Sequence, residues 1–439
     1  MSENNSNELS AVRLFGPVEA TERFVAVDIL RGFALLGILV MNIIAFAYPG
    51  GIYFSPLEAG GFEGANKLAW WFSHLLFSQK FMTIFSMLFG AGLVLMSGRA
   101  KEKNIEFGKI YYRRVFWLFL IGMLHAYFIW GGDILVPYAV GGLLLYPLRK
   151  LSATILVSLG AGLVLFGILT QVGSGYMFSY VKSEAYKAYE DRQAGEVLSE
   201  YQLQFVEGWE GLLKSFNPTA EQVAEETAVF RDGYGRILKT RAGEVLQMHT
   251  WGMVMWIFWR VTGLMLIGMG LMKLGVFNAL RSGRFYLILM IIGYAAGLPL
   301  AYYGGKIIIA HNFDLIDSFL SDRHWNYVGS VLVAMGHIGL VMLVCKSNLL
   351  EKLKRGLAAV GRMALTNYLF HSIVFTTVFY GYGLGLFNRI DRFYLLFLVF
   401  AMWLVQLYLS PVWLKYFRFG PVEWLWRTLT YWRRQPMRA

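Results

Sequence analysis

The chain has 439 residues, of which 57% are hydrophobic and only 15% are charged, and its mean hydropathy is +0.49. A soluble globular chain carries about 25% charged residues, so this composition excludes a soluble domain and predicts an integral membrane protein. The single cysteine, Cys345, excludes an intrachain disulfide and a thiolate metal cluster.

Ten apolar runs are long enough to cross a bilayer, and they predict an all-α bundle of about ten transmembrane helices. The runs cover residues 25–47, 78–97, 112–130, 133–149, 152–171, 250–272, 285–304, 326–345, 360–380 and 393–414. With a cytoplasmic N-terminus, 24 basic residues lie on the inner side and 6 lie in the short outer loops. The positive-inside rule therefore predicts that both termini are cytoplasmic. The net charge of +12 then faces anionic inner-leaflet lipid and does not indicate nucleic acid.

The predicted spans divide the chain into five segments. These are a cytoplasmic tail (1–23), spans one to five (24–172), an extracytoplasmic helical insert (173–248), spans six to ten (249–416) and a basic cytoplasmic tail (417–439). Within the insert, Thr219 and Gln222 have the spacing of a capping box that begins a helix. The tryptophan-rich C-terminal tail is predicted to lie along the inner surface as an amphipathic anchor.

The first span carries polar residues on one helical face. Asp28, Arg31 and Asn42 fall within about 60° of one another at about 100° per residue. Asp28 and Arg31 either form an intrahelical ion pair at the membrane interface or line a polar pathway together with Asn42. Lys80 begins the second span, and we predict that it is an interfacial anchor.

The third and fourth spans are joined by almost no loop, in the stretch GMLHAYFIWGGDILVPYAVGG. His125 lies just before the turn at Gly131 and Gly132, and Asp133 follows it. An Asp that orients a His is the usual way to build a general base. We therefore predict that His125 and Asp133 are catalytic; the alternative is a structural hydrogen bond that closes the hairpin.

Three residues in the C-terminal half add polar groups to predicted spans. Arg260 lies near the bilayer midplane, where a lone Arg costs about 2.5–3.5 kcal/mol on insertion scales. It must meet a carboxylate, backbone carbonyls, water or an anionic ligand, and we expect either contact with a substrate or anion or an ion pair with Asp28 or Asp133. Asn367 and His371 share a helical face at i, i+4. We assign these two residues to substrate binding together with Asp28, Arg31, Asn42 and Arg260. We assign no residue to a metal because no metal-binding signature is present.

Several motifs together resemble the YeiB-like bacterial inner-membrane family, whose C-terminal half is a domain of unknown function (418). They are RFVAVDILRGFALLGILVMNI, KFMTIFSMLFGAGL, HAYFIWGGDILVPYAVGGLL, GRMALTNYLFHS, FYGYGLGL and FGPVEWLWRTLTY. The Asp-x-x-Arg-Gly opening of the first span is also remotely similar to the ten-span membrane acyltransferases, which take an acyl group from acyl-CoA. That similarity implies that Asp28 and Arg31 match the inner polar motif. The O-acyltransferase type has a His near the place where Asn42 stands, and Asn cannot be a general base, so this resemblance implies that His125 would have to serve as the base instead.

These observations give three functional hypotheses for a multi-pass protein of the bacterial plasma membrane. The first is transfer of an acyl group from acyl-CoA to an envelope hydroxyl or amine, with no permanently bound cofactor. The second is small-molecule transport, because ten spans can form a five-plus-five inverted repeat. The third is a membrane scaffold or sensor whose insert binds a partner. The expected partners are the lipid bilayer and a small-molecule or envelope acceptor, without nucleic acid.

Overall fold

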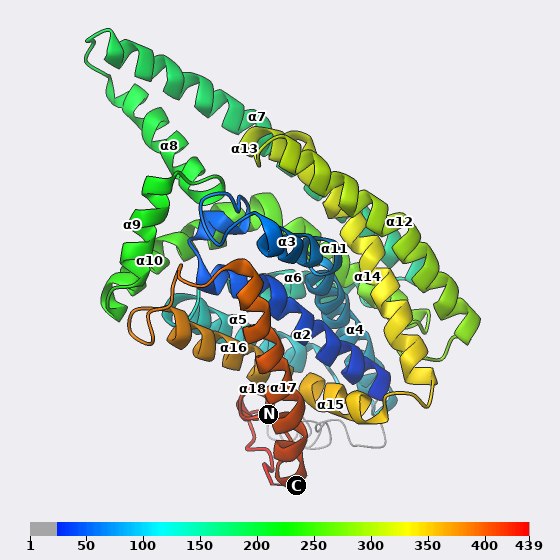
Figure 1. Ribbon diagram of the computed structural model, residues 1–439. Helices are drawn as coiled ribbons and strands as arrows, with labels where there is room; N and C mark the ends of the chain where they lie inside the picture. The colour runs from blue at the N-terminus through cyan, green and yellow to red at the C-terminus, as the bar shows by residue number, and fades with distance from the viewer. Residues whose placement is uncertain (1–23, 439) are drawn as a thin grey trace, which may run out of the picture.

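The computed structural model describes residues 24–438, and within that range it is all-helical without a β-strand (Figure 1). The predicted tail over residues 1–23 lies outside the described residues. Seven helical stretches are long and apolar enough to cross a membrane, and two shorter apolar helices span Leu135–Leu148 and Ala364–Phe379. The chain is therefore a helical membrane protein. Each of the ten predicted runs overlaps helical structure, although the runs 250–272 and 360–380 each cover parts of two helical elements.

The first half of the bundle is built from helices that match the first five predicted spans. They are α2 (Val25–Ala47), α4 (Lys80–Glu102), α5 (Gly108–Phe128), α6 (Leu135–Leu148) and α7 (Ala153–Gln193). Between α2 and α4 lie η2 (Gly50–Tyr53) and the short amphipathic helix α3 (Gly64–Leu76).

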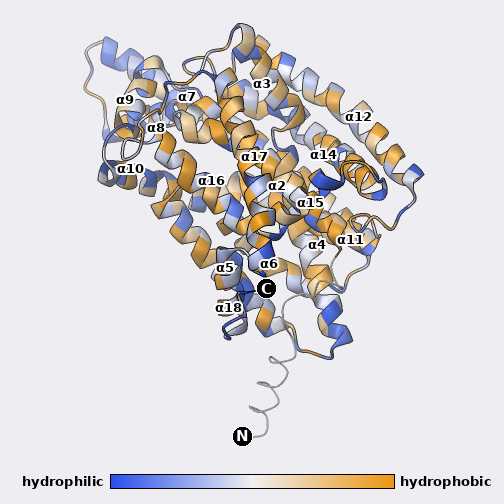
Figure 2. Ribbon diagram, turned by 60° about the horizontal axis from the view of Figure 1, so that its bottom comes forward, coloured by the Kyte–Doolittle hydropathy of each residue, from blue (hydrophilic) through white to orange (hydrophobic). Residues whose placement is uncertain are grey.

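The second half contains more helices than predicted spans. They are α11 (Phe258–Lys273), α12 (Gly283–Ala310), α13 (Leu315–Asp317), η4 (Ser318–Asp322), α14 (Arg323–Lys346), α15 (Glu351–Arg362), α16 (Ala364–Phe379), α17 (Arg392–Tyr416) and α18 (Pro421–Tyr431). In Figure 1 the insert helices and α15 with α18 lie at opposite ends of the molecule. Figure 2 shows hydrophilic residues gathered in the insert and at the ends of the bundle.

The insert is continuous with the spans that flank it. Helix α7 runs unbroken for 41 residues, so the fifth span and the start of the insert form one helix. The insert continues through α8 (Glu200–Phe216), α9 (Ala220–Phe230) and α10 (Tyr234–Gln247), and a π-helical stretch, η3 (Met248–Ile257), joins α10 to α11. The predicted capping box at Thr219 and Gln222 is confirmed. The sequence becomes polar from residue 173, which predicted the end of the fifth span, but nothing in the sequence at that point ends the helix.

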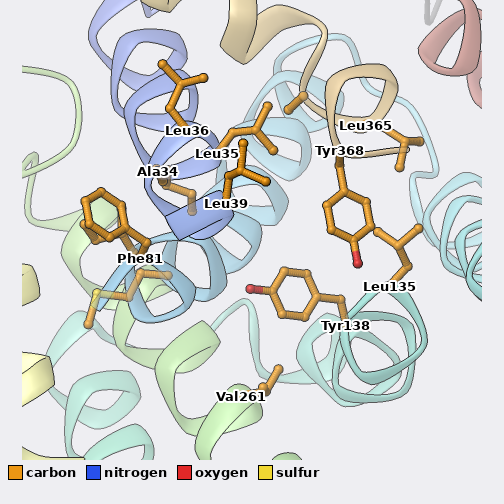
Figure 3. Packing of buried hydrophobic residues seen from close by; sticks show 14 of the residues in the cluster. Ala34, Leu35, Leu36, Leu39, Phe81, Leu135, Tyr138, Val261, Leu365 and Tyr368 are labelled. Carbon is orange, nitrogen blue, oxygen red and sulfur yellow. The ribbon is translucent and has the colours of Figure 1, made fainter. Parts of the chain in front are cut away.

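Glycines allow the helices of the core to approach closely. A Cβ on Gly32 of α2 would lie 2.0 Å from the carbonyl oxygen of Leu357, and a Cβ on Gly361 would lie 2.0 Å from that of Asp28. Such contacts between small residues are the main way in which helices pack in lipid. Figure 3 shows part of the apolar core, in which Leu39 of α2 and Phe81 of α4 belong to one buried cluster.

The C-terminal helix α18 docks on α5 and α16, and its predicted place along the inner membrane surface stays a prediction. The indole of Trp426 donates to the Arg114 carbonyl oxygen over 2.9 Å, and the Arg114 guanidinium lies 3.6 Å from the centre of the Trp426 ring. The carboxylate of Glu423 accepts from the backbone N–H groups of Leu365 and Thr366 at 2.6 and 3.0 Å. Glu423 therefore caps the N-terminus of α16, where negative charge is favoured.

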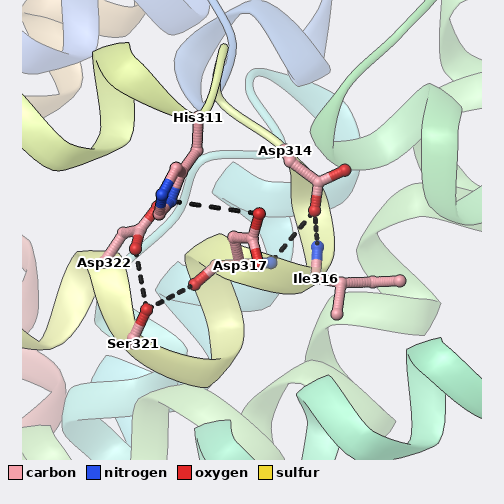
Figure 4. Close-up of polar contacts among 6 residues, drawn as sticks. All are labelled: His311, Asp314, Ile316, Asp317, Ser321 and Asp322. Atoms are coloured by element: carbon pink, nitrogen blue, oxygen red, sulfur yellow. Dashed lines mark hydrogen bonds and ion pairs between the residues drawn. The ribbon is translucent and has the colours of Figure 1, made fainter.

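A polar cluster at the corner between α12 and α14 predicts a pH-dependent stability (Figure 4). The hydrogen bond from His311 to Asp322, 2.9 Å long, raises the pKa of His311 above its ordinary value of 6.5. The folded state therefore binds this proton more tightly than the unfolded state does. The resulting stabilisation is present below about pH 6.5 and is lost as the pH rises through the raised pKa.

We expect His311→Gln to lower the melting temperature of the detergent-purified protein more at pH 5.5 than at pH 8.5. The His311 side chain is 44% exposed, so the pair should contribute less than about 1 kcal/mol. Equal losses at the two pH values would contradict this assignment.

Candidate functional site

A buried chain of three hydrogen-bonded side chains lies at the α5–α6 hairpin. His125 Nδ1 is 2.7 Å from Asp133 Oδ1, and His125 Nε2 is 2.8 Å from the Ser372 hydroxyl oxygen. All three residues are buried, with His125 1% and Ser372 0% exposed. A carboxylate only accepts hydrogen bonds, so Nδ1 carries the proton and Nε2 is left to accept from the Ser372 hydroxyl. The predicted His125–Asp133 pair therefore forms, and Ser372 extends it.

The local sequence explains how His125 and Asp133 are held. His125 lies in the last turn of α5, and Asp133 lies just before α6, beyond the Gly131–Gly132 turn. Asp133 Oδ2 accepts from the backbone N–H of Val136 at 2.8 Å, so the carboxylate also caps α6. A Cβ on Gly132 would lie 2.3 Å from the Trp130 ring, so a larger residue would force this buried indole to move. The aspartate is fixed through one oxygen and orients the imidazole through the other.

Helix α16 supplies the third residue and one wall of the site. Ser372 lies near the middle of α16, and Tyr368, one turn earlier, places its ring centre 5.1 Å from that of His125. The Tyr368 hydroxyl accepts from the backbone N–H of Ile134 at 3.3 Å, which ties α16 to the hairpin. Sequence analysis missed Ser372, although it follows directly after His371 in the motif GRMALTNYLFHS. Its partner His125 is 247 positions away.

The insert covers this hairpin with a cationic side chain. Helix α10 packs over the turn, where a Cβ on Gly131 would lie 3.5 Å from Cγ of Arg241. Arg241 is only 1% exposed, and none of its three guanidinium nitrogens has a hydrogen-bond partner among residues 24–438. Its guanidinium carbon lies 5.7 Å from the centre of the Tyr380 ring. A buried guanidinium without hydrogen bonds marks a place where an anion or water would be stabilised.

Arg260 is held by a different set of partners. Its guanidinium donates to the Tyr327 carbonyl oxygen at 3.0 Å and to the hydroxyls of Thr83 and Ser330 at 3.1 and 2.7 Å. It forms no ion pair within the described part of the chain, so the alternative of a pair with Asp28 or Asp133 is wrong. Neutral acceptors on α4 and α14 bind the two terminal nitrogens of this Arg, and its buried Nε has no hydrogen-bond partner among the described residues.

Lys80 is not the interfacial anchor that we predicted. It is 0% exposed, and its ammonium group donates to the His74 carbonyl oxygen at 2.6 Å and to Asn326 Oδ1 at 2.5 Å. Its position at the start of an apolar run suggested the membrane surface. The correction arises because His74 of α3 and Asn326 of α14 reach the Lys80 side chain at that end of α4.

The remaining predicted site residues take no part in the hydrogen-bonded network of Asp133, His125 and Ser372. Asp28 and Arg31 form the intrahelical ion pair at 2.8 Å, and Asn42 on the same helix is half-buried. Asn367 and His371 both contact α17: Asn367 donates to the Ser410 hydroxyl over 3.1 Å, and His371 Nε2 lies 2.8 Å from an oxygen of Gln406. Their assignment to substrate binding stays a prediction, and their observed contacts join two helices.

Comparison with known proteins identifies the family. Residues 271–433 match the family model described as "Protein of unknown function (DUF418)". The chain is 31% identical to the uncharacterized protein YeiB of Escherichia coli K12, over 93% of this chain and 96% of that protein. It is 29% identical to the uncharacterized protein YxaH of Bacillus subtilis 168, over 96% and 97%. No solved structure matches. The motifs, the helical membrane fold and the full-length similarity together show that this chain belongs to the YeiB-like DUF418 family.

Proposed function

We propose that this protein transfers acyl groups through Ser372, His125 and Asp133. Ser372 Oγ attacks the thioester carbonyl of an acyl-CoA while His125 Nε2 takes the hydroxyl proton, and that proton leaves with the CoA thiol. An acceptor hydroxyl or amine then attacks the acyl-serine ester and gives its proton to His125, which returns it to Ser372. Each half-reaction forms one acyl bond and breaks one, so no oxidant or additional reactant is needed.

The observation that carries this proposal is the order Ser–His–Asp with both hydrogen bonds shorter than 2.9 Å. That order activates a hydroxyl nucleophile on several unrelated folds, and it is recognised by geometry rather than by sequence position. A structural role would need only the His125–Asp133 contact to close the hairpin. The second bond, to a serine on a different helix, is what a nucleophile requires.

The position of Ser372 suits transfer across a membrane. The proposal retains ten spans and a bacterial plasma membrane location, with the insert outside and both termini in the cytoplasm. Ser372, near the middle of α16, then lies between a cytoplasmic donor and an external acceptor. The Asp28–Arg31 pair would serve the donor side, in line with the remote acyltransferase similarity. Arg241, buried above the hairpin, would contact an anionic group of the acceptor.

Helix packing gives the transporter hypothesis no support. In a five-plus-five inverted repeat, the pair α12–α14 would correspond to α4–α5, and α4–α11 would correspond to α2–α12. Helices α12 and α14 pack along much of their length, and α4 packs closely on α11. The supposed counterpart pairs have few or no contacts. We therefore do not carry the transporter as a second candidate.

The proposal is tested by trapping the acyl-enzyme. Protein reconstituted in nanodiscs is incubated with radiolabelled acetyl-CoA, quenched with acid, digested and analysed by mass spectrometry for acetylated peptides. We expect acetyl on the peptide that contains Ser372, and no label in Ser372→Ala. Ser86→Ala removes another buried serine hydroxyl, one hydrogen-bonded to Tyr138, and should label normally. Equal labelling of wild type and Ser372→Ala, or no labelling with acetyl-CoA, would refute the proposal.

A further inference from the structure

A groove between α3 and α12 lies away from the site of the proposed reaction. It encloses a cavity of about 450 Å³. The side chains that define its chemistry are Lys67, Trp71, Leu75, Tyr302, Lys306 and Ile309. Its volume is within the range of small-molecule sites, about 300–1,000 Å³.

The groove combines two cationic side chains with an aromatic wall. Lys67 and Lys306 are both exposed, and no acidic residue lines the groove. The ring centres of Trp71 and Tyr302 lie 5.2 Å apart. A Cβ on Gly305 would lie 2.6 Å from the Trp71 ring, so the indole packs directly against the backbone of α12 at this glycine. The groove therefore offers two ammonium groups beside an aromatic wall.

The aromatic wall is held from behind by packing within α3 and by the start of α4. The ring centres of His74 and Trp70 lie 4.7 Å apart, and the His74 backbone carbonyl accepts from the buried side chain of Lys80. The charge that the groove offers to a ligand is therefore that of its two exposed lysines.

We infer that this groove binds the head group of an anionic phospholipid. The phosphate would lie between the ammonium groups of Lys67 and Lys306, and an acyl chain would run past Leu75. Helix α12 continues this apolar path, since Ile291 is 53% exposed on its outer face. A lysine near a membrane surface contributes about 1 kcal/mol to binding of anionic lipid, so two lysines should change affinity roughly thirtyfold. This site does not depend on the proposed acyl transfer.

The test uses Trp71 as the reporter in vesicles of dioleoylphosphatidylcholine. A small fraction of dibrominated phosphatidylglycerol, or of dibrominated phosphatidylcholine, is included as a quencher of tryptophan fluorescence. The signal of Trp71 is obtained by subtracting that of Trp71→Phe. We expect dibrominated phosphatidylglycerol to quench Trp71 more strongly than dibrominated phosphatidylcholine does. The variant Lys67→Gln/Lys306→Gln should lower the apparent affinity for phosphatidylglycerol, relative to phosphatidylcholine, roughly thirtyfold.

A matched control removes two exposed lysines elsewhere, Lys101 and Lys352. Lys101→Gln/Lys352→Gln makes the same change in net charge and should leave the quenching as in wild type. Three results would overturn the inference. Quenching by phosphatidylcholine could equal that by phosphatidylglycerol, the control could lose as much selectivity as Lys67→Gln/Lys306→Gln, or millimolar inorganic phosphate could abolish quenching, which would show a site for a soluble anion.

Discussion

His125→Ala is expected to lower the rate of acyl transfer by about 10²–10⁴-fold while the protein remains folded. The imidazole accepts the proton of Ser372 in one half-reaction and that of the acceptor in the other, so no step proceeds normally without it. Asp133→Asn should lower the rate by a similar factor, because an amide nitrogen facing His125 Nδ1 favours the wrong tautomer. The measurement is acetyl transfer from acetyl-CoA by wild type and variants, normalised to the folded fraction.

A second buried histidine provides the control for this prediction. His337 is 6% exposed, its Nδ1 lies 2.8 Å from the Tyr294 hydroxyl, and its Nε2 lies 3.0 Å from the Leu76 carbonyl oxygen. His337→Ala also removes a buried imidazole with two partners, so it should reduce stability but leave the rate per folded molecule unchanged. If His125→Ala retained the wild-type rate, or if His337→Ala lost as much, the catalytic assignment of His125 would be wrong.

Gly361→Ala should destabilise the protein by about 3 kcal/mol. The added methyl group would lie 2.0 Å from the Asp28 carbonyl oxygen, which is backbone and cannot rotate away. Helix α15 would therefore have to separate from α2 along the whole crossing, and overpacking of this kind costs about 1–3 kcal/mol or more. Gly32→Ala on the opposite helix meets the Leu357 carbonyl oxygen at the same distance and should have a similar effect. Thermal unfolding in detergent measures both variants.

The matched control is a helical glycine that faces open space. A Cβ on Gly92 of α4 would meet no atom within 4 Å, and alanine has a higher helix propensity than glycine. Gly92→Ala should therefore be neutral or stabilising by up to about 1 kcal/mol. A wild-type melting temperature for Gly361→Ala would mean that the α2–α15 crossing is looser than the structure indicates. The crossing also explains two motifs, because DILRG and GRMALTN supply its two glycines.

The residues that sequence analysis placed correctly are those whose geometry is local. His125 and Asp133 are eight positions apart across a two-glycine turn, so a hairpin is enough to bring them together. The Asp28–Arg31 pair and the capping box at Thr219 depend on helical spacing alone. Lys80 shows the limit of such reasoning, because its position at the end of an apolar run gave no sign that α3 and α14 would bury it.

Sequence by itself therefore determined the helical membrane class, the positions of the apolar helices and the family, because hydrophobic periodicity and motif order are properties of the chain. Tertiary structure alone decided that Ser372 meets His125, that Glu423 caps α16 and that Arg260 meets neutral acceptors. These contacts join residues from 58 to 247 positions apart. They depend on which helices pack together, which in lipid is set by close packing of small residues and buried hydrogen bonds.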